Sequence, residues 1–449
     1  MHEKYNILVL HNLGDLSTSL RSMVDYLECF ERYGPEHNYI YQRWTAPITS
    51  ALREMDIHVV ILDASALGIC RYRPRDLYYE IKDRWSFIAD LDAVKLAFPQ
   101  DDYHQSNVLD ELFDDWNVDI IYSVLPKHME MLYPRSKGKA QLKGVLTGYV
   151  DDDSIDMISS LATPFAERRY DVGQRVSMYS PVGGGYARIK GLMADEVDRT
   201  AQALGFACNI SHRAEDTIHG DDWLRFLGNC RFGLGCEGGV SIWDPDGLIH
   251  DRVGTYLAEQ PTATFAEVEA ACFPGQDQTH VFSAISPRLF ESAMMQCCQL
   301  LIEGEYLGLL KPFDHYVPVK SDLSNVADAL EEMRDWEGAQ RRIAATYETL
   351  IEDPKLRYSG LVSEVMQDID ALAEKRRFVG SIDSKFKSLL ERHQHELAEE
   401  GAGLSNDPVV APLKGRAAKA FLDAAEKAPP WLRRAIPSTI RDRVKARIS

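Results

Sequence analysis

The stretch that decides the fold is NILVLHNLGDLSTSLRSMVDYLECFERYGP, residues 6–35. Its apolar run Ile7–Leu10 predicts a short buried strand. A helical pattern follows over residues 16–33, and its apolar positions share one face: Leu20, Val24, Leu27 and Phe30. Gly34 and Pro35 then end the helix, because neither residue continues it readily. A buried strand followed by an amphipathic helix is the repeating unit of an α/β fold.

This unit recurs through the first third of the chain. Further strands are predicted over residues 39–41, 59–62, 91–98, 118–124 and 144–147, with helices over residues 74–88 and 106–116. Strands and helices that alternate at this spacing predict a doubly wound domain with a parallel sheet. We place this Rossmann-like N-terminal domain at residues 1–150.

A second series of strands and helices follows a region that is rich in acids and turn residues. That region, residues 151–185, holds the run Asp151–Asp153 and the glycine-rich stretch Ser180–Gly185. It is predicted to be a connector or, alternatively, to carry a hinge or ligand loop at a domain cleft. Strands and helices alternate again over residues 186–376. The sequence therefore predicts two Rossmann-like domains that face a cleft, with a helical extension over residues 377–449.

The composition is typical of a globular protein from a reducing compartment. The chain has 449 residues, of which 45% are hydrophobic and 27% charged, and its formal net charge is −19. An acidic balance of this size argues against a protein that grips a nucleic-acid backbone. The eight cysteines form no C-x-x-C pair and have no histidine pair at zinc spacing. We therefore expect neither a zinc site nor a nucleic-acid partner.

The last 41 residues, 409–449, have the opposite charge to the rest of the chain. They hold ten Lys and Arg residues and three acids, a net charge of +7 that leaves −26 on the remainder. Ile440, Val444 and Ile448 repeat every four residues, which puts them on one helical face. This pattern fits an interfacial helix on an anionic membrane or, alternatively, a segment that packs on the acidic body. No signal peptide or spanning helix is apparent, so we expect a cytoplasmic protein that the tail could place on the inner membrane face.

Residues 230–246, CRFGLGCEGGVSIWDPD, place polar and glycine residues at the end of a predicted strand. Gly238 and Gly239 allow a ligand to approach the backbone closely. Glu237 and Asp244 could bind hydroxyl groups or act as a base. The alternative is a tight turn closed by an Asp-Pro-Asp-Gly β-turn.

A second candidate site is the helix start at Ser286-Pro287-Arg288. Proline suits the first position of a helix, and the exposed N–H groups of a helix start bind pyrophosphate well. Arg288 adds a positive charge, and Glu291 could accept hydrogen bonds from a ribose diol. The alternative is a capped helix of the core.

Other polar residues also follow predicted strands. Glu303 and Tyr306 follow one strand, and His315, a candidate base or phosphate ligand, precedes another; a lone histidine is more often structural. At the end of the first strand, the turn formed by His11, Asn12 and Gly14 lies where α/β folds bind ligands.

Several of these segments together resemble the C-terminal half of bacterial GT-B glycosyltransferases of surface-polysaccharide assembly. The segments are RFGLGCEGGVSIWDPDG (231–247), ISPRLFE (285–291), EGEY (303–306), HY (315–316) and DLSN (322–325). The resemblance is good over about residues 200–350 and only architectural over residues 1–150. It departs from the family's acid-x7-acid pattern, because Ser283 stands where the first acid would fall and only Glu291 matches.

The resemblance implies transfer of a sugar from a nucleotide-diphosphate donor to a glycan or lipid-linked acceptor, with no cofactor and no metal. It implies catalytic roles for Glu237, Asp244 and His315. It implies donor contacts from Ser286, Arg288, Glu291, Gly238, Gly239, Glu303 and Tyr306. His11, Asn12 and Gly14 would line the acceptor side. The alternatives are a nucleotide-sugar epimerase on the same fold and a non-catalytic scaffold of envelope assembly, which the serine at position 283 favours.

Overall fold

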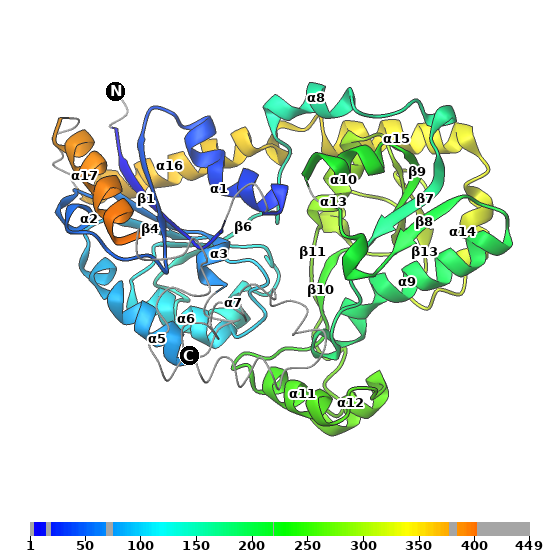
Figure 1. The fold of residues 1–449 in the computed structure, drawn as a ribbon, viewed down its shortest axis with the longest axis horizontal. Helices are drawn as coiled ribbons and strands as arrows, with labels where there is room; N and C mark the ends of the chain where they lie inside the picture. Colours follow the sequence, from blue (N-terminus) through cyan, green and yellow to red (C-terminus); the bar gives the residue numbers. More distant parts are fainter. Residues whose placement is uncertain (1–3, 15–18, 69–74, 219, 377–383, 402–449) are drawn as a thin grey trace.

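The structure is a computed structural model, and it describes all residues except 1–3, 15–18, 69–74, 219, 377–383 and 402–449. Figure 1 shows two α/β halves side by side, each built on its own sheet. The basic tail that the sequence places at residues 409–449 lies outside the described residues.

The N-terminal domain is built on a six-stranded parallel sheet in the order β2-β1-β3-β4-β5-β6. Its strands are β1 (Asn6–His11), β2 (Asn38–Arg43), β3 (Val59–Leu62), β4 (Val94–Ala97), β5 (Ile120–Ser123) and β6 (Gln141–Gly144). Every residue of β1, β3, β4 and β5 is buried. Such continuous burial is expected of a parallel sheet with helices on both faces. The helices of this part are α1 (Arg21–Tyr33), α2 (Ser50–Glu54), α3 (Ala64–Leu67), α5 (Arg75–Arg84), α6 (Ser106–Asp115) and α7 (Met129–Leu132).

The C-terminal domain is built on a five-stranded parallel sheet in the order β13-β12-β9-β7-β8. Its strands are β7 (Tyr170–Arg175), β8 (Cys208–Ser211), β9 (Cys230–Gly235), β12 (Cys298–Ile302) and β13 (Tyr316–Val319). Its helices are α8 (Ile155–Ser159), α9 (Gly184–Ala203), α10 (Gly220–Leu227), α13 (Pro287–Met294), α14 (Val326–Glu332) and α15 (Trp336–Leu350). The prediction of two doubly wound domains is confirmed.

A short antiparallel pair, β10 (Gly238–Val240) and β11 (Phe282–Ala284), carries an insertion with two helices. These helices, α11 (Leu248–Glu259) and α12 (Phe265–Cys272), project at the lower edge in Figure 1. The loop before α11 reaches the other domain, where the Gln105 and Asn107 amides donate to the carbonyls of Asp244 (3.0 Å) and Pro245 (3.1 Å). The insertion therefore joins the two domains on one side.

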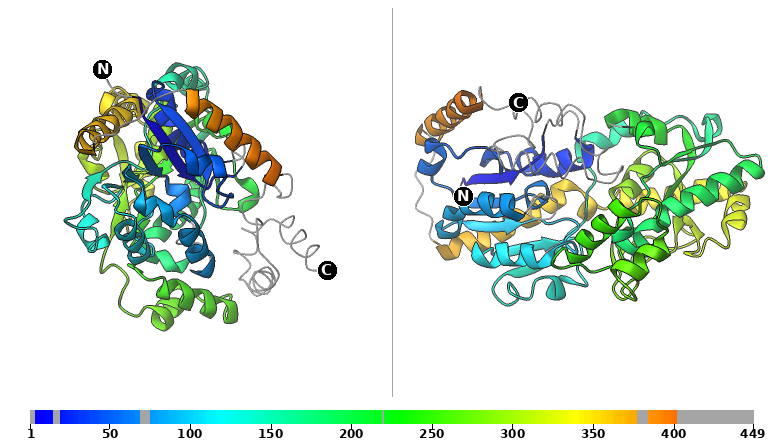
Figure 2. Two further views of the ribbon diagram at one scale, coloured as in Figure 1. Left: turned by 90° about the vertical axis from the view of Figure 1, so that its left-hand side faces the viewer. Right: turned by 60° about the horizontal axis from the view of Figure 1, so that its bottom comes forward.

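The chain returns to the N-terminal domain after the second sheet is complete. Helix α16 (Tyr358–Arg376) packs against α1, and Arg376 at its end pairs with Asp119. Helix α17 (Ser384–Gly401) lies along α2 at the outer side of the same domain, as both views in Figure 2 show. The last two described helices therefore belong to the domain in which the chain began.

Two predicted boundaries differ from the structure. The predicted connector, residues 151–185, contains β7, which lies inside the second sheet between β9 and β8. The sequence of this strand, YDVGQR, has no apolar run that could mark it. The predicted C-terminal domain, residues 186–376, includes α16, which packs on the first domain. The remaining shifts, such as β6 at 141–144 in place of 144–147, move an element by a few residues.

Among the described residues, no helix combines the length and the apolar character that are needed to cross a membrane.

We predict that Arg168→Ala strongly destabilises the C-terminal domain. The buried guanidinium group donates hydrogen bonds to four carbonyls at 2.8–3.0 Å: those of Thr163, Cys230, Met295 and Gln296. Removing it leaves all four acceptors without this donor, and those of Cys230 and Met295 are buried, so the free energy of unfolding should fall by about 3 kcal/mol or more. Urea unfolding measures this, and Arg169→Ala is the control, because Arg169 is exposed and should cost less than about 1 kcal/mol. Equal losses in both variants would contradict the prediction.

Candidate functional site

A cavity of about 750 Å³ lies between the two domains, and both contribute to its walls. The N-terminal domain supplies Asn12 and Leu13 from the end of β1 and Gln100, Asp101 and Tyr103 from the loop after β4. The C-terminal domain supplies residues that follow β7 and β8 and the start of α13. Both sheets therefore present the carboxyl ends of their strands to the cavity, which is where α/β folds bind ligands.

The cavity is basic although the chain is acidic. Of the described residues, the basic side chains that line it are Arg21, Arg175, Lys190, Arg213 and Arg288, and the acidic ones are Asp101 and Glu291. Arg213 is paired with Asp216, and Arg21 with Asp25 and Asp221. Positive charge concentrated in a concave site of a chain with net charge −19 favours an anionic ligand.

Lys190 is a partly buried cation of the cavity, and the charge of Asp101 only partly compensates it. It lies on α9 with its ammonium group 5.6 Å from the centroid of the Tyr179 ring, and it makes no hydrogen bond or ion pair with any described residue. Burial lowers the pKa of Lys190, because the charged form loses hydration. An anion in the cavity would restore the interactions that this ammonium group lacks.

The start of α13 points at the same space. Pro287 occupies its first position, and the side chain of Ser286 makes no capping hydrogen bond, so the helix start stays open toward the cavity. The guanidinium group of Arg288 lies 5.2 Å from the centroid of the Trp223 ring and donates to the carbonyl of Arg175. Its hydrogen-bond and ring partners are a carbonyl and an indole rather than a carboxylate, so its charge, which also acts on Glu291, can act on an anion at the helix start.

Glu291, one turn further along α13, is held by the indole N–H of Trp223 at 2.7 Å. Burial raises the pKa of Glu291, and the Trp223 hydrogen bond and the charges of Arg288 and Arg21 only partly offset that rise. The carboxylate lines the cavity and can still accept hydrogen bonds from a ligand, as expected for a ribose contact.

Gly238 and Gly239 also line the cavity, as predicted. Gly239 has φ +145°, and a side chain there would collide with the carbonyl of Phe282 on the neighbouring strand β11. The position therefore requires glycine. With no side chain at either glycine, the backbone of β10 itself lines the cavity.

The three predicted catalytic residues do not line the cavity. Glu237 is turned back into the domain, where it accepts hydrogen bonds from the amides of Glu305 (3.2 Å) and Tyr306 (3.0 Å). Asp244 is buried and accepts the amide of His250 at 2.8 Å, which stabilises the start of α11. His315 Nδ1 accepts the Lys311 amide at 3.1 Å, which closes a local turn. Its Nε2 lies 3.1 Å from the hydroxyl of Thr349 on α15. The described geometry gives each of these side chains a structural task.

Four further predicted residues lie away from the cavity lining. Glu303 and Tyr306 follow β12, and the fully buried Tyr306 hydroxyl donates to the carbonyl of Ile302. Gly14 is not part of the lining, whereas Asn12 is. His11 faces a separate pocket beside α1, and burial lowers its pKa to about 4. Of the predicted acceptor side, the structure brings only Asn12 to the cavity.

Sequence reasoning missed the other charged residues of the site. Arg21 and Lys190 lie within helical patterns, and Arg175 ends the strand that was not predicted. Asp101 is the only acid among the described residues that the N-terminal domain contributes to the lining. It has φ +51°, and its carboxylate accepts the Tyr103 hydroxyl at 2.8 Å. Its signal in the sequence was its place just after a predicted strand.

The described residues contain no group of three or more His, Cys, Asp or Glu placed to hold a metal ion.

Some solved structures are similar to this chain at low sequence identity. No protein-family model and no curated protein matches the chain. Similar solved structures include an alpha-glucosyltransferase in complex with UDP-glucose and DNA containing an abasic site (10% identity, TM-score 0.45, covering 82% of this chain and 100% of that one). They also include Anabaena HepE in complex with UDP and glucose (8%, 0.47, 82% and 100%), and an E. coli structure described as trehalose-6-phosphate bound with UDP-2-fluoro glucose (8%, 0.49, 81% and 99%). At these identities and TM-scores the likeness does not assign an activity to this chain.

We predict that Glu291→Gln stabilises the fold at high pH. A raised pKa means that the folded state keeps a proton over a pH range in which the unfolded state has lost it, so stability falls as pH rises through that range. Glutamine does not titrate and can still accept the Trp223 hydrogen bond. Urea unfolding should therefore show the variant to be more stable than the wild type at pH 8, with the advantage shrinking toward pH 4. Glu303→Gln, at an exposed site outside the cavity, is the control; an advantage for Glu291→Gln that is independent of pH would contradict this assignment.

Proposed function

We propose that the chain is a glycosyltransferase that moves a sugar from a nucleoside-diphosphate donor to a glycan or lipid-linked acceptor. One observation carries the proposal: Lys190, Arg288 and the open start of α13 converge on one cavity between two Rossmann-like domains. A diphosphate is the natural ligand of such an arrangement, because its two charges match a helix start flanked by two cations.

The donor would lie on the C-terminal wall. Lys190 and Arg288 stabilise the negative charge that develops on the diphosphate as it leaves, and Glu291 accepts the ribose hydroxyls. Gly238 and Gly239 let the donor pass close to the backbone. These roles leave the N-terminal wall for the acceptor.

Asp101 is the best placed base for the acceptor. In the transfer step the acceptor oxygen bonds to the anomeric carbon, the bond from that carbon to the diphosphate oxygen breaks, and the hydroxyl proton passes to the Asp101 carboxylate. Asp101 replaces Glu237, Asp244 and His315 in this role because it lines the cavity and they do not.

The acceptor class rests on two further proposals. A basic tail over residues 409–449 that binds anionic lipid would bring the enzyme to a lipid-linked acceptor of surface-polysaccharide assembly on the inner membrane face. The acidic body disfavours a nucleic acid as acceptor. Neither an epimerase nor a scaffold is favoured by any contact in the cavity, and product analysis with and without acceptor separates them from a transferase.

We predict that Lys190→Met and Arg288→Ala each weaken nucleoside-diphosphate binding about tenfold or more, since each removes a charged partner of the diphosphate. Calorimetry with UDP, GDP and ADP measures this. Arg199→Met is the matched control: it also lies on α9, but it is exposed and paired with Glu196, so affinity should not change. Wild-type affinity in the Lys190 and Arg288 variants would reject the proposed donor site.

We also predict that transfer needs no divalent metal, because the helix start and the two cations supply the charge that a metal ion would otherwise provide. Release of free nucleoside diphosphate from a nucleotide-sugar, measured with and without EDTA, should be the same. Loss of activity in EDTA that added Mg²⁺ or Mn²⁺ restores would contradict the prediction.

A further inference from the structure

Among the described residues, Arg21 is the basic residue that the N-terminal domain contributes to the cavity lining. It is the first residue of α1, and the residues around it, Leu20, Ser22 and Met23, also line the cavity. The other basic residues in the described lining belong to β7, the segment after β8, α9 and α13 of the C-terminal domain. Two helices, α1 and α13, therefore begin at the same cavity from opposite domains.

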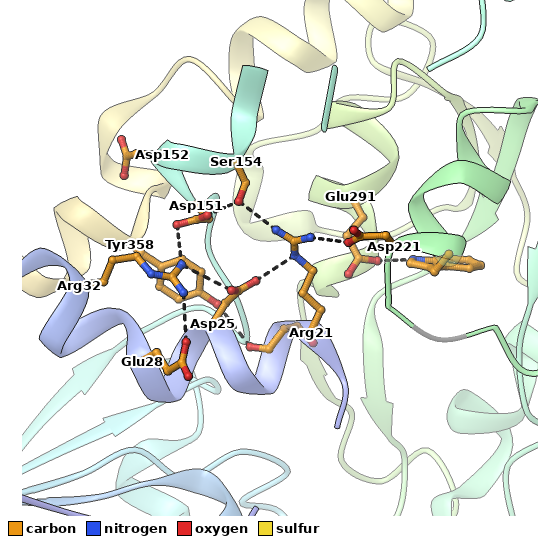
Figure 3. A network of polar contacts seen from close by, with 12 residues as sticks. Arg21, Asp25, Glu28, Arg32, Asp151, Asp152, Ser154, Asp221, Glu291 and Tyr358 are labelled. Carbon is orange, nitrogen blue, oxygen red and sulfur yellow. Dashed lines mark hydrogen bonds and ion pairs between the residues drawn. The ribbon is translucent and has the colours of Figure 1, made fainter. Parts of the chain in front are cut away.

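The guanidinium group of Arg21 is fixed by three partners (Figure 3). Its Nε donates to Asp25 at 3.3 Å on its own helix, and its two Nη atoms donate to Asp221 on α10 and to Ser154, each at 2.9 Å. Ser154 belongs to the segment that joins the two domains. Because a guanidinium group has five N–H donors, two remain beyond these three hydrogen bonds.

The contact with Asp221 alone does not explain this arrangement. Asp221 is 55% exposed and Arg21 is 28% exposed, and such an ion pair contributes little to stability. The more buried charges around Arg21 are acids: Asp25 on its own helix and Glu291 on α13. Burial raises the pKa of both carboxyls, and the charge of Arg21 acts against that rise in each. Arg21 thus separates two acids that belong to different domains.

A small cavity of about 30 Å³ lies behind this cluster. It is lined by Arg21, Asp25 and Glu291, with Asp151 and Tyr358 on its far wall. Its size suits one or two water molecules, and the carboxylates on both sides of the domain boundary share this confined space with apolar side chains such as Leu224 and Phe290. Without a cation between them they would repel each other across that boundary.

We propose that Arg21 is a further binding residue of the donor site: from the first turn of α1 it carries a cation of the N-terminal domain to the nucleotide held on the C-terminal domain. This inference rests on the proposed function. Its two remaining N–H groups bind the nucleotide, and its hydrogen bonds to Asp25 and Ser154 hold the guanidinium group in place while they do so.

The test compares three variants with the wild type. Arg21→Ala removes the cation, Arg21→Lys keeps a charge without the planar fork, and Asp221→Ala breaks only the exposed ion pair. Calorimetry uses whichever of UDP, GDP and ADP the wild type binds most tightly. Thermal unfolding confirms that each variant is folded.

We expect Arg21→Ala to weaken nucleotide binding about tenfold or more, Arg21→Lys to fall between it and the wild type, and Asp221→Ala to stay within about threefold. Equal affinities in the wild type and Arg21→Ala, or equal losses in Arg21→Ala and Asp221→Ala, would overturn the inference and leave the proposed function intact. Failure of the wild type to bind any of the three nucleotides would overturn both.

A pH series tests the electrostatic part of this role. The charged and titratable groups that face Arg21 are Asp25, Glu28 and Arg32 on α1, Asp151 and Asp152 beside Ser154, Asp221 on α10, Arg288 and Glu291 on α13, and Tyr358 on α16. Without Arg21, protonation of Asp25 and Glu291 relieves their repulsion. The affinity ratio between wild type and Arg21→Ala should therefore narrow from pH 8 to pH 5.5, and a ratio that stays constant would contradict the role assigned to Arg21.

Discussion

The proposed function depends on the basic side chains that line the cavity between the two domains of an otherwise acidic chain. Lys190 loses hydration there and forms no ion pair with any described residue, although the charge of Asp101 acts on it, and Arg288 is held over an indole ring rather than against a carboxylate. A partly buried positive charge is unfavourable unless it is paired with a negative charge. The two sheets, the return of α16 and the insertion between β10 and β11 all keep the two walls of this cavity facing each other.

Most of the framework was predictable because parallel strands that are buried on both faces show as apolar runs. Ile7–Leu10, Val59–Leu62 and Tyr316–Val319 are such runs, and each is a strand. Strand β7 was missed because Gly173, Gln174 and Arg175 break the apolar pattern. Gly173 is needed there, since a side chain would collide with the sulfur of Cys230 on the next strand. Close packing between neighbouring strands therefore requires a glycine in β7, and that glycine breaks the apolar run by which the strand could have been predicted.

The site was only partly predictable. The sequence shows which residues follow a strand or begin a helix, but it does not show which way their side chains point. The helix start at Ser286-Pro287-Arg288 carries its own local signal, so its place in the cavity followed from the sequence. Glu237 sits at the end of a strand, as a ligand residue should, but its carboxylate turns toward the amides of Glu305 and Tyr306. Conversely, Lys190 and Arg21 look like ordinary helical residues until the two domains are assembled. Which way a side chain points depends on tertiary contacts that a sequence pattern does not contain.

The central claim is that the cavity holds a diphosphate between the start of α13 and the Lys190 ammonium group. A crystal structure of the full chain with a bound nucleoside diphosphate tests it most directly. Our interpretation predicts phosphate oxygens within hydrogen-bond distance of the backbone amides at the start of α13 and of Lys190 Nζ. A nucleotide bound elsewhere on the chain, with this cavity holding only water, would contradict it.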